Sequence, residues 1–240
     1  MKKLLWFTVM LMLAAARAQA APCVSASLDA YVGLGSVGCT VAGVTFADFS
    51  IVDPISPGVA PIAPGDVTLT PLSLSGEVGL ALSSATSVSA TAGEILQLWF
   101  GFATTAGVGT FFTGNSLALG PSIVEPDGAI TIVEDKCLGG SFASPSAGCG
   151  GTPLAPLSVF DIGVLSETGA DAVFGAPLSF FDVYVDVVID GGLAGTATLG
   201  PELGQIRAAL VPEPSAAWFV AAGLILLLCS RRFRRSVVPH

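Results

Sequence analysis

The chemistry open to this chain is limited by the residues that it lacks. The only histidine is His240, the last residue, so residues 21–210 hold neither a Ser-His-Asp triad nor a Cys-His pair. Histidine-ligated zinc is excluded there for the same reason. Lys136 is the one lysine in that region, and a Ser-Lys pair would depend on it alone. Carboxylates are therefore the side chains left to support catalysis or to bind a cation.

Two groups of carboxylates lie close in sequence. The first group is Asp182, Asp186 and Asp190. They share one face of an expected strand, where a spacing of four residues is about 13 Å, too long for the acid–base pair of a glycosidase. A solvated strand face is therefore expected. The second group is Glu125, Asp127, Glu134 and Asp135. Calcium is an alternative for this group, although the residues match no EF-hand loop.

Two other patterns are compatible with ligand binding. Gly33, Gly35 and Gly38 have the spacing of a dinucleotide fingerprint, but they neither follow a clear strand nor open a helix, so we expect a Gly-rich turn. Carbohydrate sites usually expose aromatic rings. Trp99 lies in a strongly apolar run and is expected in the core. Tyr184 is expected on the wet face of a strand, which makes it the candidate sugar contact.

The elements that must position these residues are strands. Gly and Pro recur every few residues, Ser, Thr and Val fill the gaps, and helix signals are almost absent from residues 21–210. The clearest strand is Phe181 to Ile189, whose apolar and polar residues alternate. Further strands are expected at 44–52, 67–74, 94–103, 129–133, 157–165, 193–199 and 205–210. The sequence predicts an all-β, antiparallel β-sandwich or jelly-roll-like domain over residues 21–210.

Charge and cysteine content both point to the cell exterior. In residues 21–214, Lys136 and Arg207 are the only basic residues, and all eighteen carboxylates of the chain lie in this region. Such an acidic domain lacks the basic footprint that nucleic-acid binding needs. Four cysteines precede the C-terminal segment, and an even number in an oxidising compartment indicates disulfides. Of the three possible connectivities we favour the pairs nearest in sequence, Cys23–Cys39 and Cys137–Cys149.

Residues 1–20 have the layout of a secretory signal peptide. Two lysines precede an apolar run over residues 4–16, and Ala18 and Ala20 place small residues where signal peptidase reads them. We expect this helix to be cleaved after Ala20. An uncleaved anchor is the alternative, but the apolar run is short for a membrane span. A lipid on Cys23 is disfavoured, because a proline precedes that cysteine.

The C-terminal segment, residues 211–235, has three parts in a fixed order. Pro212, Glu213 and Pro214 form a stiff, extended strip, because each proline fixes φ and restricts the residue before it. A transmembrane helix is expected over residues 215–230. The basic cluster that follows is Arg231, Arg232, Arg234 and Arg235. Positive residues stay on the cytoplasmic side, so this cluster would hold the chain in the inner membrane with the domain outside.

This order of motif, apolar helix and arginine cluster resembles the PEP-CTERM sorting signal. The resemblance implies a Gram-negative bacterium that makes extracellular polysaccharide and biofilm, and recognition by a membrane-embedded exosortase that cuts near the motif. Residues 38–50, 134–137 and 182–190 are also similar to segments of the β-rich domains that carry such tails. An ordinary single-pass membrane protein is the alternative.

The first hypothesis for function is a non-catalytic surface or extracellular-matrix protein without a cofactor. Its expected partners are signal peptidase, the exosortase, the membrane during sorting, and extracellular polysaccharide. It would pass through the inner membrane to the cell surface or beyond. A carbohydrate-binding module is the second hypothesis, and a carboxylate-based glycan hydrolase ranks third.

Overall fold

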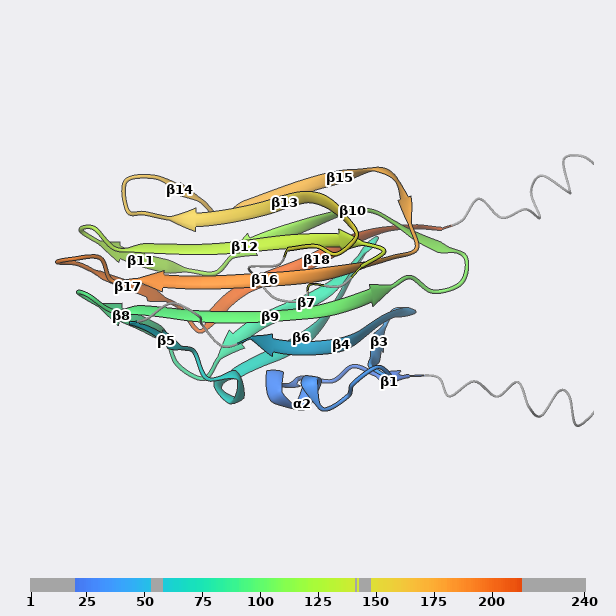
Figure 1. The fold of residues 1–240 in the computed structure, drawn as a ribbon, viewed down its shortest axis with the longest axis horizontal. Helices are drawn as coiled ribbons and strands as arrows, with labels where there is room; N and C mark the ends of the chain where they lie inside the picture. Colours follow the sequence, from blue (N-terminus) through green and yellow to red (C-terminus); the bar gives the residue numbers. More distant parts are fainter. Residues whose placement is uncertain (1–19, 53–57, 141, 143–147, 213–240) are drawn as a thin grey trace, which may run out of the picture.

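The computed structural model describes residues 20–52, 58–140, 142 and 148–212. In these ranges the chain is mostly β, with several sheets that form a sandwich-like fold (Figure 1). Nearly all of the signal peptide and everything from Glu213 onward, including the expected helix over 215–230, lie outside the described residues. No helix in the described part of the chain is long and apolar enough to cross a bilayer.

The larger sheet holds the strands that will matter for the candidate site. They are β1 (Ala21–Pro22), β3 (Cys39–Val41), β4 (Val44–Val52), β5 (Val59–Pro61), β9 (Ile95–Thr105), β12 (Ala129–Leu138), β13 (Thr152–Asp161), β14 (Ser166–Glu167) and β16 (Phe180–Asp190). Their order is β1-β3-β4-β9-β16-β12-β13-β14, with β5 beside β9. The described pairs are antiparallel, as expected, except β1–β3 and β5–β9.

A second sheet packs against the first. Its strands are β2 (Ala26–Ser27), β6 (Val67–Leu74), β7 (Glu77–Ser84), β10 (Thr110–Leu119), β15 (Gly169–Leu178) and β18 (Glu202–Pro212), in the order β15-β10-β18-β7-β6-β2. A small third sheet, at the left end in Figure 1, consists of β8 (Val88–Thr91), β11 (Ser122–Glu125) and β17 (Thr196–Leu199), with β17 in the middle.

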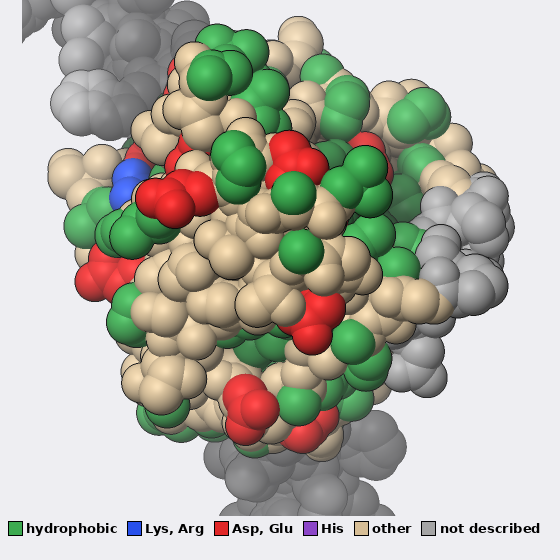
Figure 2. Space-filling view, turned by 90° about the vertical axis from the view of Figure 1, so that its left-hand side faces the viewer, with side chains coloured by type: hydrophobic (Ala, Val, Ile, Leu, Met, Phe, Trp, Pro, Cys, Tyr) green, Lys and Arg blue, Asp and Glu red, His purple; other side chains and the backbone are tan. Residues whose placement is uncertain are grey.

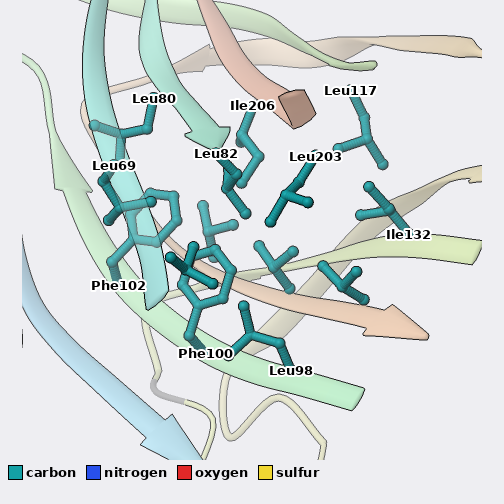
Figure 3. Packing of buried hydrophobic residues seen from close by; sticks show 14 of the residues in the cluster. Leu69, Leu80, Leu82, Leu98, Phe100, Phe102, Leu117, Ile132, Leu203 and Ile206 are labelled. Carbon is teal, nitrogen blue, oxygen red and sulfur yellow. The ribbon is translucent and has the colours of Figure 1, made fainter. Parts of the chain in front are cut away.

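The core lies between the two large sheets, because each contributes one apolar face. Along β16 the odd-numbered residues from Phe181 to Ile189 are buried, as the alternation predicts. Figure 3 shows side chains from both sheets meeting in one cluster. From the second sheet come Leu69, Leu80, Leu82, Leu117, Leu203 and Ile206; from the first come Leu98, Phe100, Phe102 and Ile132. One continuous core therefore joins the sheets.

Two short helices interrupt the strands, whereas the sequence shows almost no helix signal. They are α2 (Leu28–Val32) and the 3-10 turn η1 (Pro64–Asp66). Ser27 caps α2 by accepting a hydrogen bond from the Ala30 amide at 3.3 Å, and Leu28 and Tyr31 are buried beneath it. A helix of five residues is too short to show a helical period in the sequence.

The two disulfides pair as expected, Cys23 with Cys39 and Cys137 with Cys149. The first encloses α2 and the three glycines of the fingerprint-like pattern. Gly33 ends α2, and Gly35 and Gly38 adopt left-handed φ values of 54° and 62°. A Cβ at Gly38 would lie 2.1 Å from the carbonyl oxygen of Phe46, so only glycine fits there. The pattern is a turn, as expected.

Candidate functional site

One hollow of the described surface lies on the outer face of the larger sheet, over β4, β9 and β16. We call it the outer groove. Its volume is about 300 Å³. Its principal lining residues are Asp48, Ser50, Gly101, Phe142, Asp182 and Tyr184. Two carboxylates, a hydroxyl and two aromatic rings thus converge on one concave surface, which is the usual make-up of a small-ligand site.

The hollow exists because the middle strand lacks a side chain at its centre. Gly101 of β9 pairs with Ser50 on one side and with Tyr184 on the other. A Cβ on Gly101 would lie 3.4 Å from the Ser50 hydroxyl oxygen and 3.7 Å from a Tyr184 ring carbon. Because Gly101 has no side chain, the space above it, between the Ser50 and Tyr184 side chains, stays open.

Asp48 reaches the groove through a bulge in β4. The register between β4 and β9 shifts between Ala47 and Ser50, and Asp48 has a left-handed φ of 53°. Its backbone amide donates a 2.9 Å hydrogen bond to the Gly35 carbonyl, which fixes the bulge to the first disulfide loop. As a result Phe49 points into the core while Asp48 is exposed at the rim. A non-glycine residue at positive φ is costly and is often found at functional sites.

The carboxylates on β16 are less exposed than the sequence suggests. Asp182 and Asp186 are half-buried, and Asp186 accepts a 2.9 Å hydrogen bond from the Gln97 amide. Burial raises the pKa of Asp182, and the neighbouring Asp48 raises it further. Burial also raises the pKa of Asp186, although the hydrogen bond from Gln97 opposes this. The expected solvated face is therefore a partly desolvated acidic face.

We expect the free energy of unfolding to rise as Asp182 takes up a proton. The pKa of Asp182 is higher in the folded chain, so the folded state binds the proton more tightly. The free energy of unfolding therefore falls as the pH rises from the unfolded-state pKa through the folded-state pKa of Asp182. Asp182→Asn should reduce this dependence, as urea unfolding between about pH 4 and 7 would measure. Asp171→Asn, on the exposed strand β15, is the control for loss of one charge. An unchanged slope in Asp182→Asn would contradict the expectation.

The two aromatic residues differ from expectation in different ways. Tyr184 lies on the outer strand face, as expected, but it is only 5% exposed, because Phe142, which pairs with Cys149, packs on it with ring centroids 5.5 Å apart. Trp99 is not in the core but half-buried on the outer face, 6.3 Å from the Tyr184 ring. The run around Trp99 is apolar on both faces of β9, so its alternation cannot be read from the sequence.

The four residues weighed as a calcium site are scattered. Glu125 ends β11, and Asp127 accepts a 2.9 Å hydrogen bond from the Leu193 amide in a turn. Glu134 points into the core, whereas Asp135 faces outward from the same strand. Figure 2 likewise shows acidic side chains spread over the end of the molecule that carries β8, β11 and β17. Within the described ranges, no group of three His, Cys, Asp or Glu residues is placed to hold a metal ion.

The sorting residues fall largely outside the described ranges. Pro212 is the exposed last residue of β18, while Glu213, Pro214 and the four arginines of the basic cluster are not described. At the other end Ala20 is described and Ala18 is not. Of the sorting motif, the described residues therefore include Pro212 alone.

Comparisons with known proteins add little to this geometry. No protein-family model matches the chain, and neither does any curated protein. One solved structure with some similarity is the enzymatically active domain of tailspike protein 4 from bacteriophage CBA120, at 13% identity and a TM-score of 0.23. The match covers 72% of this chain and 20% of the tailspike chain. At this TM-score the similarity does not establish a shared fold.

Proposed function

We propose that the protein is an exported, non-catalytic surface or extracellular-matrix protein, sorted through its C-terminal segment. The observation that carries the proposal is the pair of disulfides in an acidic β domain. Two disulfides suit an oxidising, exported environment. The sorting motif follows this domain in the sequence, and its first residue, Pro212, is the last described residue of β18.

Processing at both ends is the direct test. Protein recovered from outside the producing cells should have a mass that corresponds to a start at Ala21 and an end near Pro214, and this product should disappear without the exosortase. Glu213→Ala with Pro214→Ala should also abolish it, because the stiff charged strip is lost. Pro201→Ala with Glu202→Ala makes the same two changes within the domain and should leave processing intact. A chain that extends to His240 in every strain would instead indicate a membrane-anchored protein.

A second candidate, carbohydrate binding, is favoured by the outer groove. The half-buried Trp99 ring lies next to the Tyr184 ring, which also packs on Phe142. The carboxylates of Asp48 and Asp182 line the same groove as Tyr184 and Phe142. Aromatic faces can pack on sugar rings, and carboxylates can accept hydroxyl hydrogen bonds.

We expect Trp99→Ala to weaken binding to the producer's own polysaccharide by about tenfold or more, which corresponds to about 1.4 kcal/mol. Affinity electrophoresis in gels that contain this polysaccharide would measure the change. Val173→Ala, at an exposed site on the second sheet, should bind like wild type. Equal mobility of all three proteins with and without polysaccharide would remove this candidate, and release of sugars would replace it with the hydrolase.

A further inference from the structure

Three polar side chains lie inside the sandwich, away from the outer groove. Glu134 and Lys136 are both 1% exposed and project from β12 toward the second sheet, and Asn115 on β10 is 3% exposed. Lys136 is the only lysine between the signal peptide and the C-terminus. The neighbours of Glu134 and Lys136 on β16 are Val185 and Val183, both core residues. The domain's one lysine is thus fully enclosed in an apolar interior.

These three side chains meet at one carboxylate oxygen. The Asn115 Nδ2 donates a 2.8 Å hydrogen bond to Glu134 Oε2, and the Lys136 Nζ lies 4.0 Å from the same atom. The Glu134 carboxylate is therefore hydrogen-bonded to the Asn115 amide and lies close to the Lys136 amine. Because β10 and β12 belong to different sheets, the cluster spans the sandwich.

While the three side chains are not joined covalently, several of their buried polar atoms lack hydrogen-bond partners. Lys136 Nζ, Glu134 Oε1 and Asn115 Oδ1 are buried and find no hydrogen-bond partner among the described residues. A buried amine without a hydrogen bond is costly, and an ion pair at 4.0 Å offsets only part of the cost. Such a costly arrangement would persist only if the surrounding fold enforced it or if it had a chemical use.

We propose that Lys136 and Asn115 join through an intramolecular amide bond that links the two sheets, with Glu134 moving the proton. The Lys136 nitrogen attacks Asn115 Cγ and forms a new C–N bond. The bond between Cγ and Nδ2 breaks, one proton passes from Nζ to Nδ2 through Glu134, and ammonia leaves. Nothing is oxidised or reduced, and no cofactor is consumed.

The surroundings favour the reactive forms of these groups. An amine must be neutral to attack a carbonyl carbon, and burial lowers the pKa of Lys136, although Glu134 and Asp135 oppose this. Burial raises the pKa of Glu134 to about 7, with Lys136 and the Asn115 hydrogen bond acting in the opposite direction. A carboxyl group that readily holds a proton beside the amide nitrogen suits the transfer to the leaving group.

The product would also suit its site. The bond replaces a buried amine and a primary amide by one neutral secondary amide, so fewer polar atoms need partners. It would join β10 to β12 covalently, in addition to the two disulfides, and unlike them it would survive reducing agents.

The test is the mass and the tryptic map of the full chain, reduced and denatured. If the bond forms, the fragment that ends at Arg207 should include Asn115 and be lighter than its sequence by one ammonia, about 17 Da. Trypsin should fail to cut after Lys136, because an acylated lysine is not a cleavage site. Cleavage after Lys136 together with full sequence mass in the wild-type protein would overturn the proposal.

Three variants locate the reaction. Lys136→Arg keeps the charge but should not react, and Asn115→Ala lacks the amide, so both should retain full mass. Glu134→Gln keeps both reacting groups and should slow bond formation by about 100-fold or more, measured as the mass change over time after synthesis. Loss of ammonia that persists in Lys136→Arg would place the event elsewhere and would also overturn the proposal. The wild-type map decides the question even if a variant does not fold.

Discussion

Phe100→Ala should destabilise the domain by about 3–5 kcal/mol, a large part of the about 5–15 kcal/mol that holds a typical domain together. Phe100 is 0% exposed and stacks on Phe102, with centroids 6.1 Å apart. It lies at the centre of the cluster in Figure 3, where both sheets contribute neighbours. Removing the ring loses the transfer free energy and leaves a cavity that strands paired on both sides cannot close.

The measurement is urea unfolding followed by fluorescence. Phe180→Ala is the matched control, because Phe180 is 45% exposed at the start of β16 and the same atoms are removed. We expect this variant to lose less than half as much stability. If the two variants unfolded at the same urea concentration, the assignment of Phe100 to the core would be wrong.

Replacing Cys23 and Cys39 by alanine should lower the free energy of unfolding by about 3 kcal/mol. Their disulfide closes a separation of 16 residues that contains α2 and the turn carrying Gly35. In the chain-entropy account, opening this loop gives the unfolded chain many new conformations. The effect should also reach the outer groove, because Gly35 accepts the hydrogen bond that fixes Asp48.

Thermal unfolding of the double variant beside wild type would measure this loss. Cys137→Ala with Cys149→Ala opens a loop of similar size, with a separation of 12 residues, and should cost a similar amount. That second variant removes the cross-link at Cys149, which pairs with Phe142, so Phe142 should be held less firmly on Tyr184 and Tyr184 should become more exposed. Insensitivity of the wild-type unfolding temperature to a reducing agent would show that the disulfides do not contribute to stability.

Local patterns in the sequence predict many of the strands. The expected strands at 44–52 and 67–74 coincide with β4 and β6, and Phe181 to Ile189 lies within β16. These segments alternate or carry β-branched residues between turn signals, so the pattern is local and readable. The expected strand at 157–165 is displaced, because β13 begins at Thr152 and ends at Asp161.

The sequence analysis misses or shortens the strands that contain a glycine or a buried polar residue. Strand β7 contains Gly79, where a Cβ would lie 2.0 Å from the Ile206 carbonyl oxygen, so a close strand contact requires a residue typical of turns. Strand β10 contains Gly114 and the buried Asn115. The expected strand at 129–133 stops where Glu134 and Lys136 begin, because charged residues are expected outside, yet β12 continues to Leu138 with both inside.

The candidate site is harder to predict than the strands. The outer groove requires Gly101 to stand between Ser50 and Tyr184, and this alignment comes from pairing between segments far apart in sequence. Asp48 faces the groove only because of a bulge at positive φ, for which an aspartate gives no clear local signal. Tyr184 is covered by Phe142, which is far from it in sequence. Long-range register therefore determines the site.

The position of β18 has a mechanical consequence for a protein held by its C-terminus. β18 is hydrogen-bonded to β10 along nearly its whole length and to β7 along most of it, from Pro212 back to Glu202. Hydrogen bonds in antiparallel pairs are perpendicular to the strands, so a pull on Pro212 along the strand loads them together in shear. A pull from the other end first meets β1, which pairs with β3 at only two positions. A domain tethered through Pro212 would therefore carry tension through a strand that is paired on both sides.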